Sequence, residues 1–396
     1  MKLRKFESGD LESLGPLMAM AFGGDIPPAE RYFDPEQNPR MDLDRVHVIE
    51  EDGQVRASAT VLPLEMFVDG EAVPMGGIAA VATHPAYRRR GYAGELMRAV
   101  LADMRSRGIH LSLLAPFSHS FYRAYGWELA TEGIGYVLKP DELPTSSGQR
   151  FVRDYLEEDV PEMQRLLEIE ASQHSCGVRR SDGRWRQLLE GGDTELQGLQ
   201  AAVYEKEDEV EGYLLYKHSE REGKTPPRRL TVYEILARTP EVHAGLLSFA
   251  AAYDPLEFEV KYETPRGEPL HPHLKSSYVD ARVHPDMMLR ITDVEEALGL
   301  MQRRTSDPLV LEVSDDVIPE NSGEYTVGGG EVFRGAEAEE RVALDVRQLA
   351  QLYAGYLPAR ELSRRGYIEL GSEKALELLG EMFPAGDPWG FPLDRF

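Results

Sequence analysis

The chain has 396 residues, of which 69 are acidic and 44 basic, and its formal net charge is −25. This charge argues against nucleic acid as a partner, because an acidic chain repels phosphate unless it carries a concentrated basic patch. The one tight basic cluster is Arg88–Arg90. The global acidity fits two interpretations, a solubility device or the attraction of cationic substrates.

No apolar run reaches the length of a membrane span, and residues 1–10 are not followed by the apolar stretch of a signal peptide. Cys176 is the only cysteine, which excludes an intramolecular disulfide and a cysteine-based zinc site. We therefore expect a cytoplasmic protein. At about 100–200 residues per domain, the length predicts two or three domains.

The first predicted domain, residues 1–140, alternates strand and helix patterns. In chain order, the pattern predicts a helix at Leu11–Phe22, a break at Asp25–Pro28, strands at Arg45–Glu50, Val55–Pro63 and Val73–Val81, a helix at Gly94–Arg107, a strand at Ile109–Ala115, a short helix at Ser118–Tyr125 and a strand at Trp127–Leu138. This order favours an α/β or α+β domain.

The second predicted domain, residues 150–286, repeats this order of elements. Val232–Ala237 followed by Arg238-Thr239-Pro240 parallels Ile78–Ala82 followed by Thr83-His84-Pro85. We interpret the second segment as a diverged internal repeat of the first.

The third predicted domain, residues 287–396, has a strand and helix over Met288–Met301 and helices at Val346–Tyr353 and Lys374–Met382. Its last residues carry Trp389, Phe391 and Phe396. A solvated tail rarely holds three aromatic rings, so we expect this terminus to be packed against the protein.

The strongest chemical signal is a strand, loop and helix over residues 81–97, with the loop pattern Arg88-x-x-Gly91-x-Ala93. Small residues let the backbone approach a ligand closely. Successive N–H groups at a helix N-terminus, with arginines beside them, form a cradle for phosphate groups. An ordinary glycine turn before a helix is the alternative interpretation.

With the block Phe121–Glu128 (FYRAYGWE) downstream, this loop resembles the GNAT superfamily of acetyl-CoA-dependent N-acetyltransferases. One such domain, a second without the loop and a C-terminal domain resemble the Eis (enhanced intracellular survival) acetyltransferases. The resemblance implies tandem GNAT-like domains, each a mixed sheet flanked by helices, and a sterol-carrier-protein-like α+β domain. It also implies one acetyl-CoA site per chain, no metal, and a homohexamer built as a trimer of dimers.

The resemblance also implies individual roles. The general acid is Tyr122, and the α-carboxylate of Phe396 is the general base. The residues implied to bind acetyl-CoA are Val81, Ala82 and Thr83 along the pantetheine arm, Arg89, Arg90, Gly91, Tyr92, Ala93 and Gly94 around the pyrophosphate, and Phe117 and Ser118.

Acetyl transfer to an amine requires one group that accepts the amine proton and another that protonates or stabilises the departing thiolate. A positioned carboxylate can accept the proton of an attacking amine, and a neutral phenol, with a pKa near ~10, can donate one to a departing thiolate. A core tyrosine is the alternative for Tyr122, and a packed terminus without chemistry is the alternative for Phe396. Arg395 argues against a terminus that itself attracts polycations. Asp25 is either an acceptor-site residue or a turn cap.

Other candidates are weaker. His84 and His119 flank the predicted site and are either bases or structural histidines, and His271-Pro-His273 resembles a metal pair without a third ligand. The first functional hypothesis is acetylation of amines on polycationic small molecules, for which the resemblance implies aminoglycosides or polyamines. The alternatives are a protein lysine or N-terminal acetyltransferase and, from another class, a non-catalytic acyl-CoA or lipid sensor.

Overall fold

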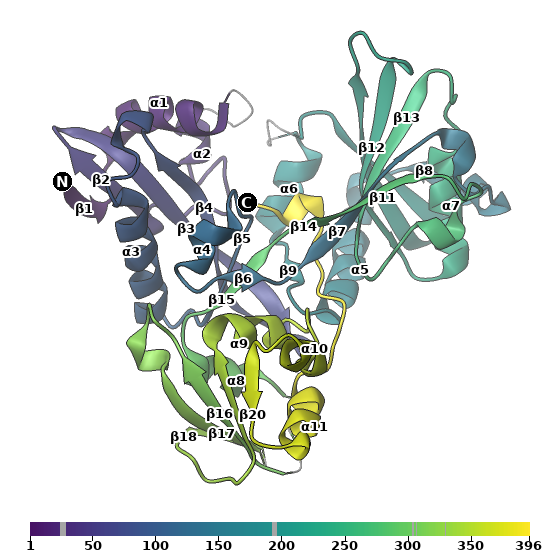
Figure 1. The fold of residues 1–396 in the computed structure, drawn as a ribbon. Coiled ribbons are helices and arrows are strands. Elements are labelled where there is room, and N and C mark those ends of the chain that lie inside the picture. Colours follow the sequence, from purple (N-terminus) through teal and green to yellow (C-terminus); the bar gives the residue numbers. More distant parts are fainter. Residues whose placement is uncertain (24–28, 192–195, 303–304, 306, 329) are drawn as a thin grey trace.

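The computed structural model describes residues 1–23, 29–191, 196–302, 305, 307–328 and 330–396 (Figure 1). Asp25 and the predicted break at Asp25–Pro28 lie outside them. Within these ranges the chain forms three sheets with helices packed against them, so the predicted mixed sheets flanked by helices are confirmed. None of the helices in these ranges is long and apolar enough to cross a membrane.

Each face of the first sheet packs against a helix of the first domain. Its strands, in spatial order, are β1 (Lys2–Lys5), β2 (Val46–Glu51), β3 (Gln54–Val68), β4 (Glu71–Thr83), β5 (Leu111–Leu114), β15 (Met288–Ile291) and β6 (Glu128–Leu129), and β9 (Val178–Arg179) pairs with β3. Helix α1 (Leu11–Phe22) packs on the face that carries Val48, and α3 (Tyr92–Ser106) packs on the face that carries Ile49. This alternation of neighbouring residues is what a half-buried strand requires. Two short helices, α2 (Ala29–Tyr32) and α4 (His119–Arg123), complete this part.

The second sheet repeats the antiparallel and parallel pairing of the first. Its order is β14 (Asp280–Pro285), β7 (Glu132–Leu138), β13 (Phe258–Pro265), β12 (Arg228–Ala237), β11 (Glu209–Glu220), β10 (Leu199–Lys206) and β8 (Val152–Asp154). Its helices are α5 (Val160–Ser172), α6 (Asp182–Leu189) and α7 (Pro240–Ala250). In both sheets a strand that ends before a helix pairs in parallel with the next strand along the sheet, β4 with β5 and β12 with β13.

The two sheets exchange strands near the predicted domain boundaries. The single strand predicted at Trp127–Leu138 is in fact two strands, β6 in the first sheet and β7 in the second. The chain leaves the first sheet between them, where the N–H groups of Ala130 and Thr131 both bond to the carbonyl of Met287. In return, β15 pairs with β5 and β6. The boundaries at residues 140, 150 and 287 stay predictions, and strands on both sides of them contribute to the neighbouring sheet.

The third sheet belongs to the C-terminal domain. Its order is β18 (Glu331–Arg334), β17 (Gly323–Gly328), β16 (Leu309–Ser314), β19 (Arg341–Asp345) and β20 (Ile368–Leu370). Its helices are α8 (Val294–Leu300), α9 (Val346–Tyr353), α10 (Ala359–Arg364) and α11 (Glu373–Met382).

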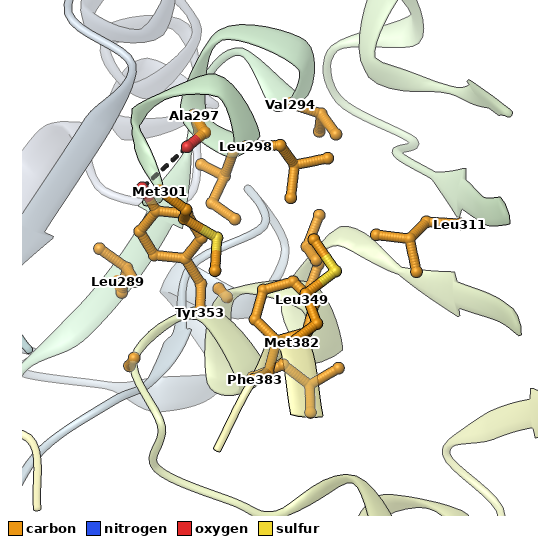
Figure 2. Packing of buried hydrophobic residues seen from close by; sticks show 14 of the residues in the cluster. Leu289, Val294, Ala297, Leu298, Met301, Leu311, Leu349, Tyr353, Met382 and Phe383 are labelled. Atoms are coloured by element: carbon orange, nitrogen blue, oxygen red, sulfur yellow. Dashed lines mark hydrogen bonds between the residues drawn. The ribbon is translucent and has the colours of Figure 1, made fainter. Parts of the chain in front are cut away.

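The core of this third domain is continuous with the first sheet. Figure 2 shows Leu289 of β15 next to Tyr353, in the same buried apolar cluster as Leu298, Leu349 and Phe383. Tyr353 is 3% exposed, and its hydroxyl donates to the carbonyl of Ala297 at 2.8 Å, the dashed line in the figure. Because one apolar cluster joins the two parts, the third domain has a fixed place from which the C-terminal tail, residues 384–396, departs.

Candidate active site

β4 and β5 pair only at the start of their shared edge, over Met75–Gly77 and Leu111–Leu113. β4 then continues to Thr83 with β3 on its other side. Among the described residues, no strand pairs with the β5-facing edge of β4 beyond Gly77. Backbone polar groups on such an edge need partners, so the edge suits an extended, amide-containing ligand such as a pantetheine arm. The predicted residues Val81, Ala82 and Thr83 lie on this stretch.

β4 also carries a bulge that the sequence analysis did not predict. Its register with β3 shifts between Ser58 and Thr60, and Ala80 has a φ of 51°. The Ser58 hydroxyl donates to the Ala80 carbonyl at 3.0 Å and is fully buried, which holds the bulge in place. Bulges are common next to active sites because they redirect backbone groups. No residue type at position 80 signals it, since alanine rarely adopts a positive φ.

The basic loop ends in left-handed backbone, with φ of 62° at Arg89 and 85° at Gly91. Helix α3 then begins at Tyr92, two residues earlier than the sequence pattern predicted, and no side chain caps its first N–H groups. Arg88, Arg89 and Arg90 are exposed. An uncapped 15-residue helix with arginines at its N-terminus can bind an anionic group through both its N–H groups and its dipole.

Neighbouring side chains fix the start of α3. The Tyr92 hydroxyl donates to a carboxylate oxygen of Glu51, so the backbone of Tyr92 is the part left for a ligand. The Arg90 guanidinium lies 4.6 Å from the centre of the Tyr87 ring. A Cβ on Gly94 would lie only 2.5 Å from the Tyr125 hydroxyl oxygen, so this position requires glycine for the close approach of Tyr125.

Tyr122, on α4, lies in a shell of aromatic rings and is 2% exposed. Its ring centre is 5.2 Å from that of Phe117, 5.0 Å from that of Phe121 and 6.3 Å from that of Trp127. Burial raises the pKa of Tyr122 well above its ordinary value, so the phenol stays neutral in any physiological buffer. No described residue hydrogen-bonds its hydroxyl. Ser118 caps α4 through the N–H of Phe121, and the Phe117 ring is 69% exposed.

The C-terminal residue packs where β4 and β5 part. A Cβ on Gly77 would lie 2.8 Å from Cε2 of Phe396, so the ring lies directly on the last paired residue of β4. Figure 1 shows the C-terminus beside β4 and β5. Tyr122 belongs to the buried cluster that includes Ile78 and Leu114, the residues just past the last paired positions. The Phe396 ring packs against the cluster on the other face, which includes Val48 and Ala79, so the two predicted catalytic residues lie on opposite faces of the first sheet.

Aromatic side chains and ion pairs anchor the tail that leads to Phe396. Trp389 and Phe391 are each 2% exposed and pack into the second domain, which confirms the expected packed terminus. Arg180 bonds to Asp394 at 2.5 Å and to Glu234 at 2.9 Å, and all three are buried or nearly so.

Arg395 is the last anchor before the terminus. It bonds to Asp286 at 2.6 Å and also to Glu263. Burial raises the pKa of Glu263, but hydrogen bonds and charge from His284 and Arg395 outweigh it and lower that pKa to about 2. Arg395 is thus neutralised by two carboxylates, so it is a clamp for the terminus. These partners of Arg395 were not predicted from the sequence, because they lie more than 100 residues away in the chain.

A cavity of about 410 Å³ adjoins the tail. Four arginines and four carboxylates line it, namely Arg40, Arg179, Arg180, Arg184, Glu65, Glu168, Asp182 and Asp394. Arg179 pairs with Glu168 at 2.9 Å and with Glu65 at 3.5 Å. Arg40 donates to the carbonyl of Arg395 at 3.2 Å, which brings this cavity to the residue next to Phe396. The lining is balanced in charge, unlike the chain as a whole.

The weaker candidates have structural partners. Nδ1 of His84 accepts from the N–H of Ala86 at 3.2 Å, and His119 is the first residue of α4. His271 contacts the Tyr136 hydroxyl at 3.0 Å, and the His273 ring lies 5.4 Å from that of His243. These contacts favour the structural interpretation for His84, His271 and His273.

The chain matches known protein families and structures. Residues 2–130 and 176–291 each match a family model described as an acetyltransferase (GNAT) domain, and residues 294–390 match a sterol carrier protein domain. An uncharacterised N-acetyltransferase of Streptomyces avermitilis is 25% identical over 338 residues, covering 81% of this chain and 82% of the relative.

Solved structures share the whole fold. A GCN5-related N-acetyltransferase from Anabaena variabilis matches with a TM-score of 0.86 at 23% identity, and Eis1 from Mycobacterium abscessus matches with 0.79 at 21%, each over 100% of both chains. The chain therefore consists of two GNAT domains and a sterol carrier protein domain, and it is an acetyltransferase. Its GNAT domains imply acetyl-CoA as the co-substrate.

Proposed function

We propose that this acetyltransferase acetylates an amine of a small molecule at the point where β4 and β5 part in the first domain. One observation carries the proposal. The unpaired edge of β4, the uncapped start of α3 and the buried Tyr122 all belong to the first domain, and the C-terminal Phe396 packs on Gly77 of the same β4. The same domain is the one that matches a GNAT model over residues 2–130.

In this proposal the unpaired backbone of Val81, Ala82 and Thr83 hydrogen-bonds the pantetheine arm. The N–H groups from Gly91 to Gly94, with Arg89 and Arg90, hold the pyrophosphate. The exposed Phe117 ring covers the apolar part of the cofactor, and Ser118 holds α4 in place beside it. Acetyl-CoA supplies the activated acetyl group, and holding both reactants in place contributes much of the acceleration.

The proton transfers are assigned to Tyr122 and to the α-carboxylate of Phe396. The carboxylate takes a proton from the amine as the new C–N bond forms, and the Tyr122 hydroxyl interacts with the sulfur as the C–S bond breaks. Because its pKa is raised, full proton transfer to a thiolate with an ordinary pKa near ~8.5 is uphill. Tyr122 then contributes most as a hydrogen-bond donor, and solvent completes the protonation of CoA.

The acceptor class is the finer part of the proposal. The resemblance to Eis proteins favours aminoglycosides and polyamines, and the solved Eis1 structure has the same fold. The cavity beside the tail supports a polycationic acceptor only weakly. Its four carboxylates could attract such an acceptor, but four arginines in the same lining balance their charge. We therefore place aminoglycosides and polyamines first in an acceptor panel and include simple monoamines and peptides. The expected homohexamer stays a prediction.

The test is release of CoA over this panel, measured with a thiol reagent, in wild type, Tyr122→Phe and the control Tyr253→Phe. Tyr253 hydrogen-bonds His218 in the second domain, away from the site. We expect Tyr122→Phe to lower kcat by roughly 10²-fold or more while the affinity for acetyl-CoA stays within about twofold. Unchanged turnover would remove Tyr122 from the mechanism. Binding of acetyl-CoA without transfer to any acceptor would favour a sensor, and transfer only to peptides would favour a protein acetyltransferase.

A further inference from the structure

Glu170, His174 and Glu268 come together in the second domain, on elements that the acetyl-transfer site does not use. Glu170 lies near the end of α5, His174 follows that helix, and Glu268 follows β13. One ligand-type atom from each residue lies within 4.8 Å of the others. Nε2 of His174 is 3.2 Å from Oε1 of Glu170.

The histidine is oriented as a metal ligand is. Its Nδ1 lies 3.2 Å from the carbonyl of Asp387, which can only accept, so Nδ1 carries the hydrogen and Nε2 faces Glu170. Metal-bound histidines commonly donate their second ring N–H to a backbone carbonyl in this manner. The ring of Trp389 lies 4.9 Å from that of His174 and restricts its rotation.

The charge of this cluster is unbalanced. Glu170, Glu268 and the side chain of Asp387 place three carboxylates around one histidine, because Asp387 lies against Gly267, next to Glu268. In the described part of the chain, neither Glu268 nor Asp387 forms an ion pair with lysine or arginine. A cavity of about 370 Å³, lined by His174, Ser175 and Asp387, opens beside it and gives solvent and ions access.

We propose that Glu170, His174 and Glu268 bind one divalent transition-metal ion of the zinc type. One imidazole and two carboxylates, with a water as fourth ligand, make a tetrahedral zinc site. Zinc bonds of about 2.0–2.2 Å place ligand atoms roughly 3.4 Å apart, so rotation of the side chains must bring the three atoms closer by up to about 1.4 Å. The ion would join α5 to the loop after β13 and fix the histidine that holds the tail at Asp387. This ion would have a structural role outside the acetyl-transfer site. The expectation that acetyl transfer itself uses no metal is therefore unaffected.

The full-length protein, stripped with a chelator, is titrated with zinc chloride by calorimetry, and cobalt(II) absorption reports the coordination geometry. We expect one zinc ion per chain in the wild type and at least a tenfold weaker affinity in His174→Gln and in Glu268→Gln. His218→Gln removes another histidine of the same domain, one that hydrogen-bonds Tyr253 and contacts no carboxylate among the described residues, and it should bind zinc as the wild type does. Glu268 lies on an exposed loop, so its variant tests the site even if His174→Gln folds poorly.

Equal zinc affinity in wild type, His174→Gln and Glu268→Gln, or no binding at 100-fold excess zinc, would overturn the site. Hydrogen exchange at the Trp389 amide tests its effect on the tail, since this N–H bonds to the carbonyl of Ser175 at 2.8 Å. Zinc should slow this exchange in the wild type and leave it unchanged in His174→Gln. If zinc binds but exchange at the Trp389 amide does not slow, the metal site is supported and the proposal that the ion stabilises the tail is wrong.

Discussion

The two GNAT domains of this chain share one strand, loop and helix arrangement but differ at the helix N-terminus. In the first domain, α3 begins after Gly91 with no side-chain cap and with three exposed arginines beside it. In the second, Thr239 accepts a hydrogen bond from the N–H of Val242 and caps α7, and Pro240 is its first residue. Arg238, which precedes them, pairs with Glu162 at 2.7 Å. An anion-binding end is available in the first domain and occupied by its own side chains in the second.

The two parallel strand pairs, β4 with β5 and β12 with β13, also differ in what lies beyond their paired residues. β12 and β13 pair in parallel only over Arg228–Val232 and Phe258–Tyr262, as β4 and β5 do over a shorter run. Beyond this run, Glu234 of β12 bonds to Arg180, which also holds Asp394 of the tail. The C-terminal segment thus places its anchors mainly in the second domain and contacts the first at Arg395, whose carbonyl accepts from Arg40, and at Phe396. Two copies of one fold can therefore differ in function. The difference lies in which groups occupy the space between the two parallel strands and the N-terminus of the following helix.

The largest expected effect comes from moving the terminus. Appending Gly-Ser-Gly-Ser after Phe396 displaces the carboxylate from the gap between β4 and β5, while the anchors at Asp394 and Arg395 stay in place. We expect kcat to fall by roughly 10²–10⁴-fold, the usual contribution of a positioned base. The same four residues placed before Met1 serve as the control. Full activity of the C-terminally extended enzyme would show that the terminus only packs.

The next prediction compares matched substitutions near the N-termini of α3 and α7. A Cβ at Gly94 would meet the Tyr125 hydroxyl, and one at Gly245 of α7 would lie 2.6 Å from Cε2 of Tyr204. Both Gly94→Val and Gly245→Val should destabilise the fold by about 1–3 kcal/mol through overpacking. Only Gly94→Val should also raise the KM for acetyl-CoA, by about tenfold or more, because it shifts the start of α3. An equal rise in both variants would contradict a single cofactor site.

A smaller effect tests the clamp on the tail. The pKa of Glu263 in the folded protein is about 2, below its ordinary value of 4.5. Its stabilising contribution is therefore complete above pH 4.5 and is lost as the pH falls toward 2. We expect the wild type to lose more stability than Glu263→Gln between pH 7 and pH 3, by at most about 2 kcal/mol.

Thermal midpoints over this pH range measure the difference. Burial raises the pKa of Asp286 and outweighs Arg395, and Glu263 adds to this rise. Glu263 also raises the pKa of His284 through their hydrogen bond. Both titrations stabilise the wild type as the pH falls and do so less in Glu263→Gln, so they reduce the expected difference. Parallel curves for wild type and Glu263→Gln would show that the Arg395 clamp adds no pH-dependent stability.

The smallest effect concerns the capped helix. Thr239→Ala removes the cap of α7 and should cost about 1 kcal/mol of stability, while Thr239→Ser should restore it. The KM for acetyl-CoA should not change in either variant, because α7 contacts no cofactor in this proposal. A change in KM would show that the second domain contributes to binding after all.

The sequence predicted the parts of this structure that short-range patterns determine. The spacing of apolar residues located α3 to within two residues, and the aromatic content of the last ten residues predicted a packed terminus. The exchange of β7 and β15 was not predictable, because alternation along Glu132–Leu138 marks a strand but not its partner. Arg180 was missed for a related reason, since its partners Glu234 and Asp394 lie 54 and 214 residues away. Only packing of the whole chain brings such side chains together.

The strand exchange has a consequence for how the protein is made. The first sheet needs β15 between β5 and β6, and β15 ends at Ile291, about 160 residues after β6. At a synthesis rate of roughly 5–20 residues per second, the N-terminal domain waits about 8–30 seconds on the ribosome before its sheet can close. During that interval one edge of β5 is unpaired, which makes it a surface for chaperones and for aggregation. Cofactor affinity should therefore appear late in synthesis, after the second domain has emerged.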